Sequence, residues 1–282
     1  MWQELCKTRK EYLERAQLDT KGYSPRRSET LLYEIARLDG MDIKKQDFFN
    51  ILNDIEISPK VTREDTHRIK DLSNAFLYLV KCAQQRKRLS LDFVREVSAK
   101  VMQHTGKEVY TTIGGYDTSL GDFRLGEEYY EEGVLANYAQ IPDMLEQLCK
   151  ETNEKLGNVH DILTVKLAAD FHYRFMHIKP FGAGNISVGL LMMNYIQMMF
   201  REPLIIIPTP QHPKHSNVSW ERNYFPNFAK KSPRRNNIIH FPMPEVGFDK
   251  HKLRHHFLIQ KPPSPLQHVN FNPFHQTFLA LN

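Results

Sequence analysis

Apolar side chains recur every three or four positions along most of the first 208 residues, and short polar segments separate these stretches. This spacing predicts amphipathic helices. We expect helices over about residues 2–17, 28–38, 66–89, 91–103, 142–156, 160–175 and 186–200. Residue types that favour helix starts precede or open several of them: Thr62 with Asp65, Ser90, Pro142 and Asn158. The pattern therefore predicts a mainly α-helical bundle.

Residues 109–138 break this pattern, because β-branched and aromatic residues there alternate with glycines. Such alternation predicts a small β-hairpin, a flap set into an otherwise helical protein. An open strand edge can take up an extended peptide as an added strand. A surface hairpin without a partner fits the same residues, so both interpretations stay open.

Composition divides the chain near Thr209. Residues 209–282 hold ten Lys or Arg and three Asp or Glu, so the net charge of +5 comes from this end, which is also rich in proline and histidine. The overall 41% hydrophobic and 25% charged residues exclude a wholly disordered chain. We expect N-terminal helices over residues 1–60, a core over 61–208 and a basic tail over 209–282.

The tail allows two interpretations. Its basic pairs Lys230-Lys231 and Arg234-Arg235 lie among aromatic residues, a composition that can contact nucleic acid. A basic extension packed loosely on the body is the simpler explanation. The chain lacks an apolar run of about 20 residues that would span a membrane, and it starts with a charged amphipathic segment, so we expect a cytoplasmic protein. Its three cysteines are widely spaced and predict buried side chains.

The segment from Pro180 to Asn185 joins two predicted helices through Gly182 and Gly184. Glycines permit a turn with its amide N–H groups directed inward, and Asn185 is a suitable helix cap. The following helix start adds unpaired N–H groups and a positive dipole end. The segment is therefore a candidate phosphate site, with candidate ligands Phe181, Gly182, Gly184, Asn185 and Ser187. An ordinary turn between helices has a similar composition, and this alternative also stays open.

Residues 178–195, IKPFGAGNISVGLLMMNY, resemble the Fic (Fido-domain) signature IHPFxDGNGRxxRLLMNY at identical spacing. Residues 167–175 resemble the helix that leads into the family's loop. Gly121, Asp122, Phe123 and Arg124 resemble its flap, and residues 34–43, with Asp39 and Gly40, resemble its inhibitory stretch. The resemblance implies a Fic-like helical bundle with a β-flap that docks a target protein chain. It also implies transfer of AMP from ATP, with Mg²⁺, to a hydroxyl group of that target.

The sequence departs from the signature where the family has its chemical groups. Replacements fall at the base (Lys179), the metal-binding acid (Ala183), the last glycine (Ile186) and the two arginines (Ser187 and Leu190). A free lysine has a pKa of about 10.4 against about 6.5 for histidine, so Lys179 is a poor base at neutral pH. We therefore expect a pseudoenzyme with residual nucleotide or phosphate binding and no motif ligand for a metal. Asp39, at the inhibitory acid position, is expected to lack its arginine partner.

Other roles for these residues remain open. Lys179 is either the base, a point-charge phosphate ligand or a solvated loop lysine. His177 is a second candidate base, whereas His172 is expected to pack in the core. A transferase with non-standard chemistry is one alternative function. Another is a non-catalytic scaffold that binds proteins through the flap and the basic tail.

Overall fold

The computed structural model describes residues 25–56, 58–126, 129–130, 133–134, 136–157 and 163–209, together with the helical backbone at Lys7 and Glu11. Those two positions agree with the predicted first helix. The rest of that helix, the expected Asn158 cap and the tail beyond Thr209 lie outside the described residues.

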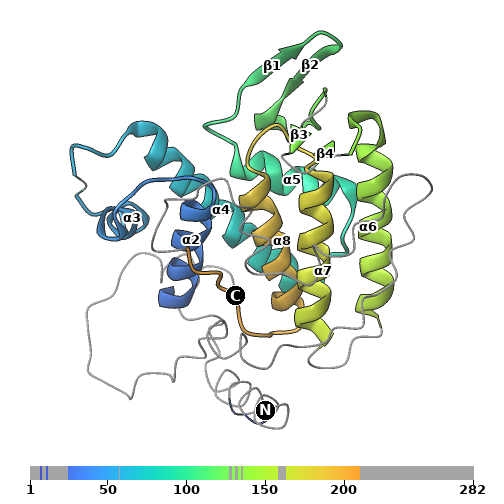
Figure 1. The fold of residues 1–282 in the computed structure, drawn as a ribbon. Helices are drawn as coiled ribbons and strands as arrows, with labels where there is room; N and C mark the ends of the chain where they lie inside the picture. Colours follow the sequence, from blue (N-terminus) through green and yellow to red (C-terminus); the bar gives the residue numbers. More distant parts are fainter. Residues whose placement is uncertain are drawn as a thin grey trace. The chain divides into compact units, whose positions relative to one another are not determined.

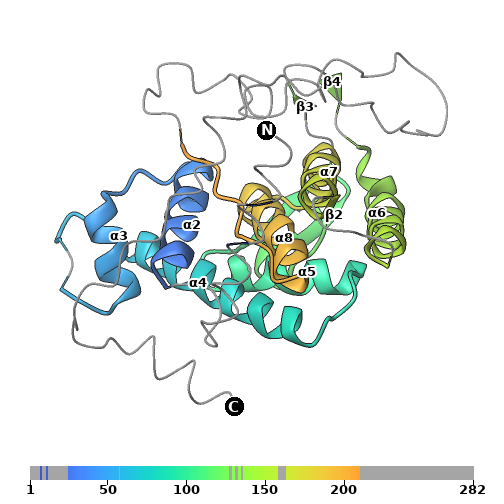
Figure 2. The same ribbon diagram turned by 90° about the horizontal axis from the view of Figure 1, so that it is seen from below.

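The described part of the chain is mainly helical, as the periodicity predicts. Its α-helices are α2 (Pro25–Leu38), α3 (Lys45–Leu52), α4 (Arg63–Gln84), α5 (Leu91–Val101), α6 (Ile141–Leu156), α7 (Leu163–Ile178) and α8 (Asn185–Met199). Helix α8 lies in the middle, with α2 and α3 on one side and α7 and α6 on the other (Figures 1 and 2). The expected helical bundle is therefore confirmed.

Helix starts follow the side-chain chemistry of the sequence. Thr62 forms a capping box with Asp65, whose N–H donates to Thr62 Oγ1 at 3.0 Å. Ser90 accepts the N–H of Phe93 at 3.1 Å, and Pro142 lies in the first turn of α6. The two hydrogen bonds give a partner to an N–H group that would otherwise lack one at the helix start. Pro142 has no N–H group, so its position needs no partner.

Helix α8 is buried on almost every side, which explains its nearly continuous apolar sequence. Met192, Met193 and Met198 pack in the core, as expected. A Cβ at Gly189 would lie 3.0 Å from Phe175 Cδ1, so this glycine lets α7 approach α8 closely. The core of the protein is therefore built around α8.

The flap is smaller than the 109–138 segment suggests. Strands β1 (Glu108–Thr111) and β2 (Gly114–Asp117) form an antiparallel hairpin that pairs Glu108 with Asp117 and Thr111 with Gly114. A second short pair, β3 (Tyr129–Tyr130) and β4 (Gly133–Val134), follows. Two 3₁₀ turns, η1 (Thr118–Leu120) and η2 (Tyr138–Gln140), complete the connection to α6.

An extended segment, residues 201–209, follows α8 and is held by side chains of two helices. Asn194 accepts the N–H of Ile205 at 2.8 Å and donates to its carbonyl at 3.1 Å. The Glu34 carboxylate on α2 accepts the N–H of Thr209 at 2.7 Å. This segment therefore connects the end of α8 to α2.

Two further features of the described residues bear on the sequence analysis: the burial of the cysteines and the length of the helices. Cys82 and Cys149 are buried free thiols, and burial raises the pKa of Cys149 to about 12. Within the described residues, every helix is too short or too polar to cross a lipid bilayer.

Candidate functional site

The α7–α8 loop is closed by its own asparagine. Asn185 Oδ1 accepts the N–H of Phe181 at 3.0 Å, and Asn185 Nδ2 donates to the Phe181 carbonyl at 2.6 Å. Asn185 is therefore not the helix cap that the sequence suggests. Gly184 takes that position, with a φ of 72°, a left-handed conformation that glycine adopts readily. Asn185 instead fixes the shape of the loop.

Arg124 fixes the loop from the flap side. Its side chain is only 2% exposed, and Nε donates to the Lys179 carbonyl at 2.8 Å. Its two terminal nitrogens donate to the carbonyls of Gly126 and Ala136 at 2.6 and 2.7 Å. The backbone N–H of Arg124 also donates to the Pro180 carbonyl at 3.0 Å. Arg124 thus joins the chain after the hairpin to the loop, and its guanidinium faces inward.

The other predicted flap residues also make internal contacts. Gly121 has a φ of 69°, and a Cβ there would lie 2.2 Å from the Arg95 carbonyl oxygen. Asp122 binds Arg95 at 2.8 Å, and Phe123 forms a β-bridge to Phe181 with ring centroids 5.7 Å apart. These contacts position the loop. Target docking by residues 121–124 stays a prediction.

Lys179 occupies the first position of the loop with a φ of 46°, a conformation that is uncommon for residues other than glycine. Its N–H donates to the Phe175 carbonyl at 2.8 Å, and its carbonyl accepts from Arg124. The residues that line the cavity described next do not include Lys179. The geometry therefore gives Lys179 a role in the backbone of the loop, and its role as a base stays a prediction.

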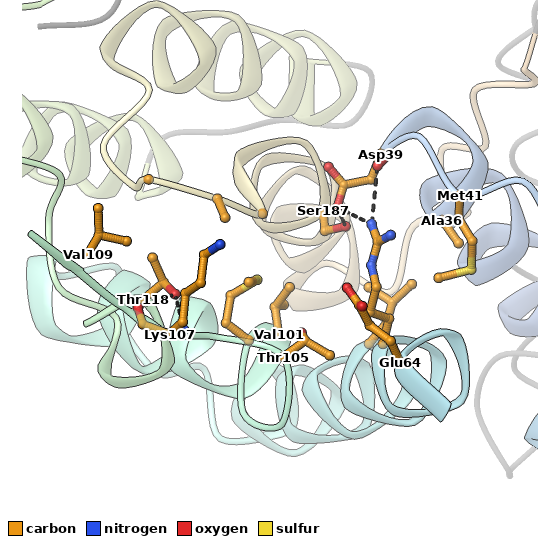
Figure 3. Close-up of a pocket in the computed structure, with 16 residues that line it drawn as sticks. Ala36, Asp39, Met41, Glu64, Val101, Thr105, Lys107, Val109, Thr118 and Ser187 are labelled. Carbon is orange, nitrogen blue, oxygen red and sulfur yellow. Dashed lines mark hydrogen bonds and ion pairs between the residues drawn. The ribbon is translucent and has the colours of Figure 1, made fainter. Parts of the chain in front are cut away.

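A cavity of about 380 Å³ lies beside the loop (Figure 3). This volume is within the usual range of small-molecule sites, about 300–1,000 Å³. The cavity is bounded by the ends of α2 and α5, by α4, by the start of the hairpin and by the loop. Its lining includes Gly182, Ala183, Gly184 and Ser187 from the loop and α8, and Asp39, Glu64, Arg68, Lys107 and Thr118 from the other walls.

Asp39 has partners in this cavity, which corrects the expectation that the inhibitory acid position lacks one. The Ser187 hydroxyl donates to Asp39 Oδ2 at 2.7 Å, and Arg68 Nη2 lies 3.8 Å from the same oxygen (Figure 3). Arg68 Nη2 also donates to the Asp39 carbonyl at 3.2 Å. Burial raises the pKa of the Asp39 carboxyl, although the Ser187 hydrogen bond and the Arg68 charge act in the opposite direction.

Sequence reasoning missed Arg68 and Lys107, the two basic residues of the lining. Arg68 precedes the buried Ile69 in α4, where a basic residue resembles any other on a polar helix face. Lys107 precedes β1, and its ammonium group points into the cavity (Figure 3). One sequence feature could have drawn attention to Arg68. Glu64 and Arg68 are four positions apart, and this spacing places both side chains on one face of α4.

The site fits a phosphate group better than a motif-bound metal. Ala183 offers no oxygen ligand at the acid position, and the Asp39 carboxylate already binds Ser187. No group of three or more His, Cys, Asp or Glu side chains in the described part of the chain could hold a metal ion. The lining holds two cationic side chains, Arg68 and Lys107, and two carboxylates, Asp39 and Glu64. The cations and the adjacent loop glycines are the groups that suit phosphate oxygens.

Comparisons with known proteins show which family and fold the chain resembles. Residues 88–197 match the Fic/DOC family. A protein adenylyltransferase Fic of Drosophila erecta is 24% identical over 153 residues, which cover 54% of this chain and 28% of that protein. The chain thus spans little more than a quarter of this curated relative.

Solved structures show the same fold. A Fic-domain signaling protein of Bacteroides thetaiotaomicron superposes with a TM-score of 0.56 at 20% identity, covering 81% of this chain and 77% of that one. Residues 134–508 of Fic-1 from C. elegans give a TM-score of 0.52 at 18% identity, covering 64% and 51%. A Fic family protein of Desulfovibrio desulfuricans gives 0.51 at 15% identity, covering 80% and 58%.

The fold and the loop together define a helical domain with a small-molecule cavity at the start of its central helix. The sequence resemblance is confirmed: residues 88–197 match the Fic/DOC family, and solved Fic-domain structures share the fold.

Proposed function

We propose that this Fic-domain protein descends from AMP transferases and binds a nucleotide or another phosphate compound with little or no transfer. The observation that carries the proposal is the cavity beside a loop that has Pro180, Phe181 and Gly184 at the signature positions but lacks the signature's reactive side chains. Asn185 still closes the loop, while the base, acid and arginine positions hold Lys179, Ala183, Ser187 and Leu190.

The losses at these positions affect different steps of the transfer. Removal of a general base typically lowers a rate by about 10² to 10⁴, and removal of each charge-stabilising donor lowers it by about 10² to 10³. Leu190 is buried and apolar, and the Ser187 hydroxyl already binds Asp39. Neither side chain stabilises a developing negative charge as a guanidinium group does. Binding and turnover are therefore separable in this protein.

A transfer assay with radiolabelled ATP tests this proposal. We expect the wild type to label neither itself nor added protein above the level of a heat-inactivated sample. The double variant Lys179→His, Ala183→Asp restores a base and an oxygen ligand at the signature positions. Histidine suits position 179, because it tolerates a left-handed φ better than most residues do. Wild-type transfer that is abolished by Lys179→Ala would contradict the proposal and would identify Lys179 as a catalytic residue.

A second candidate function is protein binding through the β1–β2 hairpin. Tyr110 and Ile113 are 75% and 51% exposed, an unusual degree for large apolar side chains on a short hairpin. The two strands pair only with each other in the described residues, so both keep an open edge. Such an edge and two exposed apolar side chains suit an extended target peptide.

Site-specific photocrosslinking distinguishes this candidate. A crosslinking amino acid at Tyr110 is expected to capture a discrete partner in cell extract, and the same probe at Ile55, which is 57% exposed and lies outside the hairpin, serves as the control. Identical products from both positions would contradict a specific docking role for the hairpin.

A further inference from the structure

Two histidine rings lie side by side where α4 meets the turn after α5. His67 is on α4, and His104 is in the turn that connects α5 to β1. Their ring centroids are 5.3 Å apart, with an angle of 51° between the ring planes. His67 is half-buried and the His104 side chain is 50% exposed, so solvent reaches both residues. Neither residue lines the cavity beside the α7–α8 loop, so the pair is a separate feature of the fold.

A buried carboxylate fixes the orientation of His104. Asp71 is fully buried, its Oδ1 lies 2.6 Å from His104 Nδ1, and its Oδ2 accepts the His104 backbone N–H at 2.8 Å. Because a carboxylate only accepts hydrogen bonds, Nδ1 carries the proton of the neutral ring and Nε2 carries the lone pair. Nε2 therefore faces away from Asp71 as an available donor atom for a metal. Histidines that bind metal ions in proteins are commonly oriented by a carboxylate in this way.

The spacing of the two rings suits a single metal ion between them. Zn²⁺ binds histidine nitrogens at about 2.0–2.1 Å and prefers tetrahedral angles. With about 1.2 Å from a ring nitrogen to its centroid and an angle of about 109° at the ion, two ligating rings have centroids about 5.2–5.4 Å apart. The observed separation of 5.3 Å lies in this range.

The protein supplies two ligands at this position. Both oxygens of Asp71 bind His104, and the described part of the chain has no group of three or more His, Cys, Asp or Glu side chains that could hold a metal ion. Water molecules would complete the coordination. Arg63 and Glu64, one turn before His67 on α4, have opposite charges, so their effects on a nearby cation largely cancel.

We propose that His67 and His104 together bind one Zn²⁺ ion, or another divalent transition-metal ion that imidazole favours, and that Asp71 positions His104 for this role. The ion joins α4 to the turn that leads into the β1–β2 hairpin. This site does not depend on a ligand in the cavity, so the inference goes beyond the proposed function.

Residue-resolved labelling with diethyl pyrocarbonate, which modifies accessible histidine rings, tests the site in the full chain. Mass spectrometry reports each histidine separately, so the other histidines of the chain do not obscure the result. We expect ZnCl₂ to protect His67 and His104 over the same range of concentration. MgCl₂ should protect neither, because Mg²⁺ prefers oxygen ligands. His177, an exposed histidine whose ring packs on Tyr173, is the control and should stay reactive.

Single variants test whether the two rings share one ion. His104→Gln should abolish the protection of His67, and His67→Gln should abolish that of His104. Asp71→Asn keeps an acceptor for the His104 backbone N–H, but its amide group can donate to Nδ1 and thereby place the ring proton on Nε2. We expect this variant to need about 10–100-fold more Zn²⁺ for half-protection of both histidines. His177→Gln should leave these values unchanged.

The outcomes decide both parts of the proposal. Absence of Zn²⁺ protection in the wild type, or protection of His67 that persists in His104→Gln, would overturn the shared site. An equal Zn²⁺ requirement in Asp71→Asn and the wild type would overturn the positioning role of Asp71 and leave it as a residue that holds the turn. Circular dichroism checks the folding of each variant. Should Asp71→Asn not fold, the two histidine variants, which change side chains that solvent reaches, still decide the shared site.

Discussion

His172 is buried inside the bundle, against α8 at Gly189. Burial disfavours the charged imidazolium and lowers the pKa of His172 to about 3, whereas an unfolded histidine titrates near 6.5. The unfolded chain therefore binds a proton more readily than the folded one between these values. The stability linked to His172 is complete above pH 6.5 and is lost as the pH falls toward 3.

The first prediction follows from this pKa. Within that range the wild type should lose up to about 1.4 kcal/mol of unfolding free energy per pH unit through His172, and His172→Gln should lose correspondingly less. Urea unfolding at pH 7.0 and pH 4.5 measures the difference. His177→Gln removes an exposed histidine as the control and should follow the wild type. Equal acid sensitivity of His172→Gln and the wild type would contradict the buried, neutral imidazole.

The second prediction compares two glycines with left-handed backbones. Gly121→Ala is expected to destabilise the protein by several kcal/mol, because its Cβ would lie 2.2 Å from the Arg95 carbonyl oxygen. Gly40 has a φ of 86° but no neighbouring atom within 4 Å, so Gly40→Ala should cost only about 1–2 kcal/mol of backbone strain. Thermal unfolding of both variants provides the comparison, and equal losses would show that the close approach at Gly121 is not rigid.

At the residue scale the sequence predicts conformations better than contacts. Gly40 ends a helix and Gly184 adopts a turn conformation, as their residue type implies. The partner of Asn185 is four residues back, and the partner of Asp39 is 148 residues away. The Asp39–Ser187 pair is long-range and depends on how the helices pack together, which local spacing does not encode.

At the scale of elements, the starts of α4, α5 and α6 were predictable and two segments were not. Helix α3 has eight residues and is stabilised by the burial of Phe48, Ile51 and Leu52, so its local pattern is too short to stand out. The extended segment 201–209 has no regular period. It is held by Asn194 and Glu34, which come from two different helices.

The third prediction concerns Arg124, which joins the flap to the α7–α8 loop. Arg124→Leu should lower the unfolding free energy by about 3 kcal/mol or more, because three partly buried carbonyls lose a charged donor. Arg37→Leu removes a surface pair with Asp42 and should cost at most about 1 kcal/mol. Chemical denaturation of both variants tests this, and a loss below 1 kcal/mol for Arg124→Leu would contradict the anchoring role.

At the scale of the whole molecule, the signature spacing was enough to predict a Fic-like helical bundle. The comparisons confirm this fold, and the family match covers residues 88–197. The signature also showed which groups are replaced. It did not predict the cation-lined cavity, because Arg68 and Lys107 lie outside the signature and become neighbours of the loop only through packing. Retained loop residues, Pro180, Phe181, Gly184 and Asn185, together with replaced reactive groups are the basis of the central claim, that this protein binds a phosphate compound without efficient transfer.

The most direct test is calorimetric titration of the wild-type protein with ATP in the presence and absence of Mg²⁺, with adenosine as the control ligand. We predict saturable ATP binding that is tighter than adenosine binding and changes little with Mg²⁺, because Ala183 offers the ion no ligand. Salt should weaken this binding, since cationic side chains carry it. ATP that binds no better than adenosine under either condition would contradict the account.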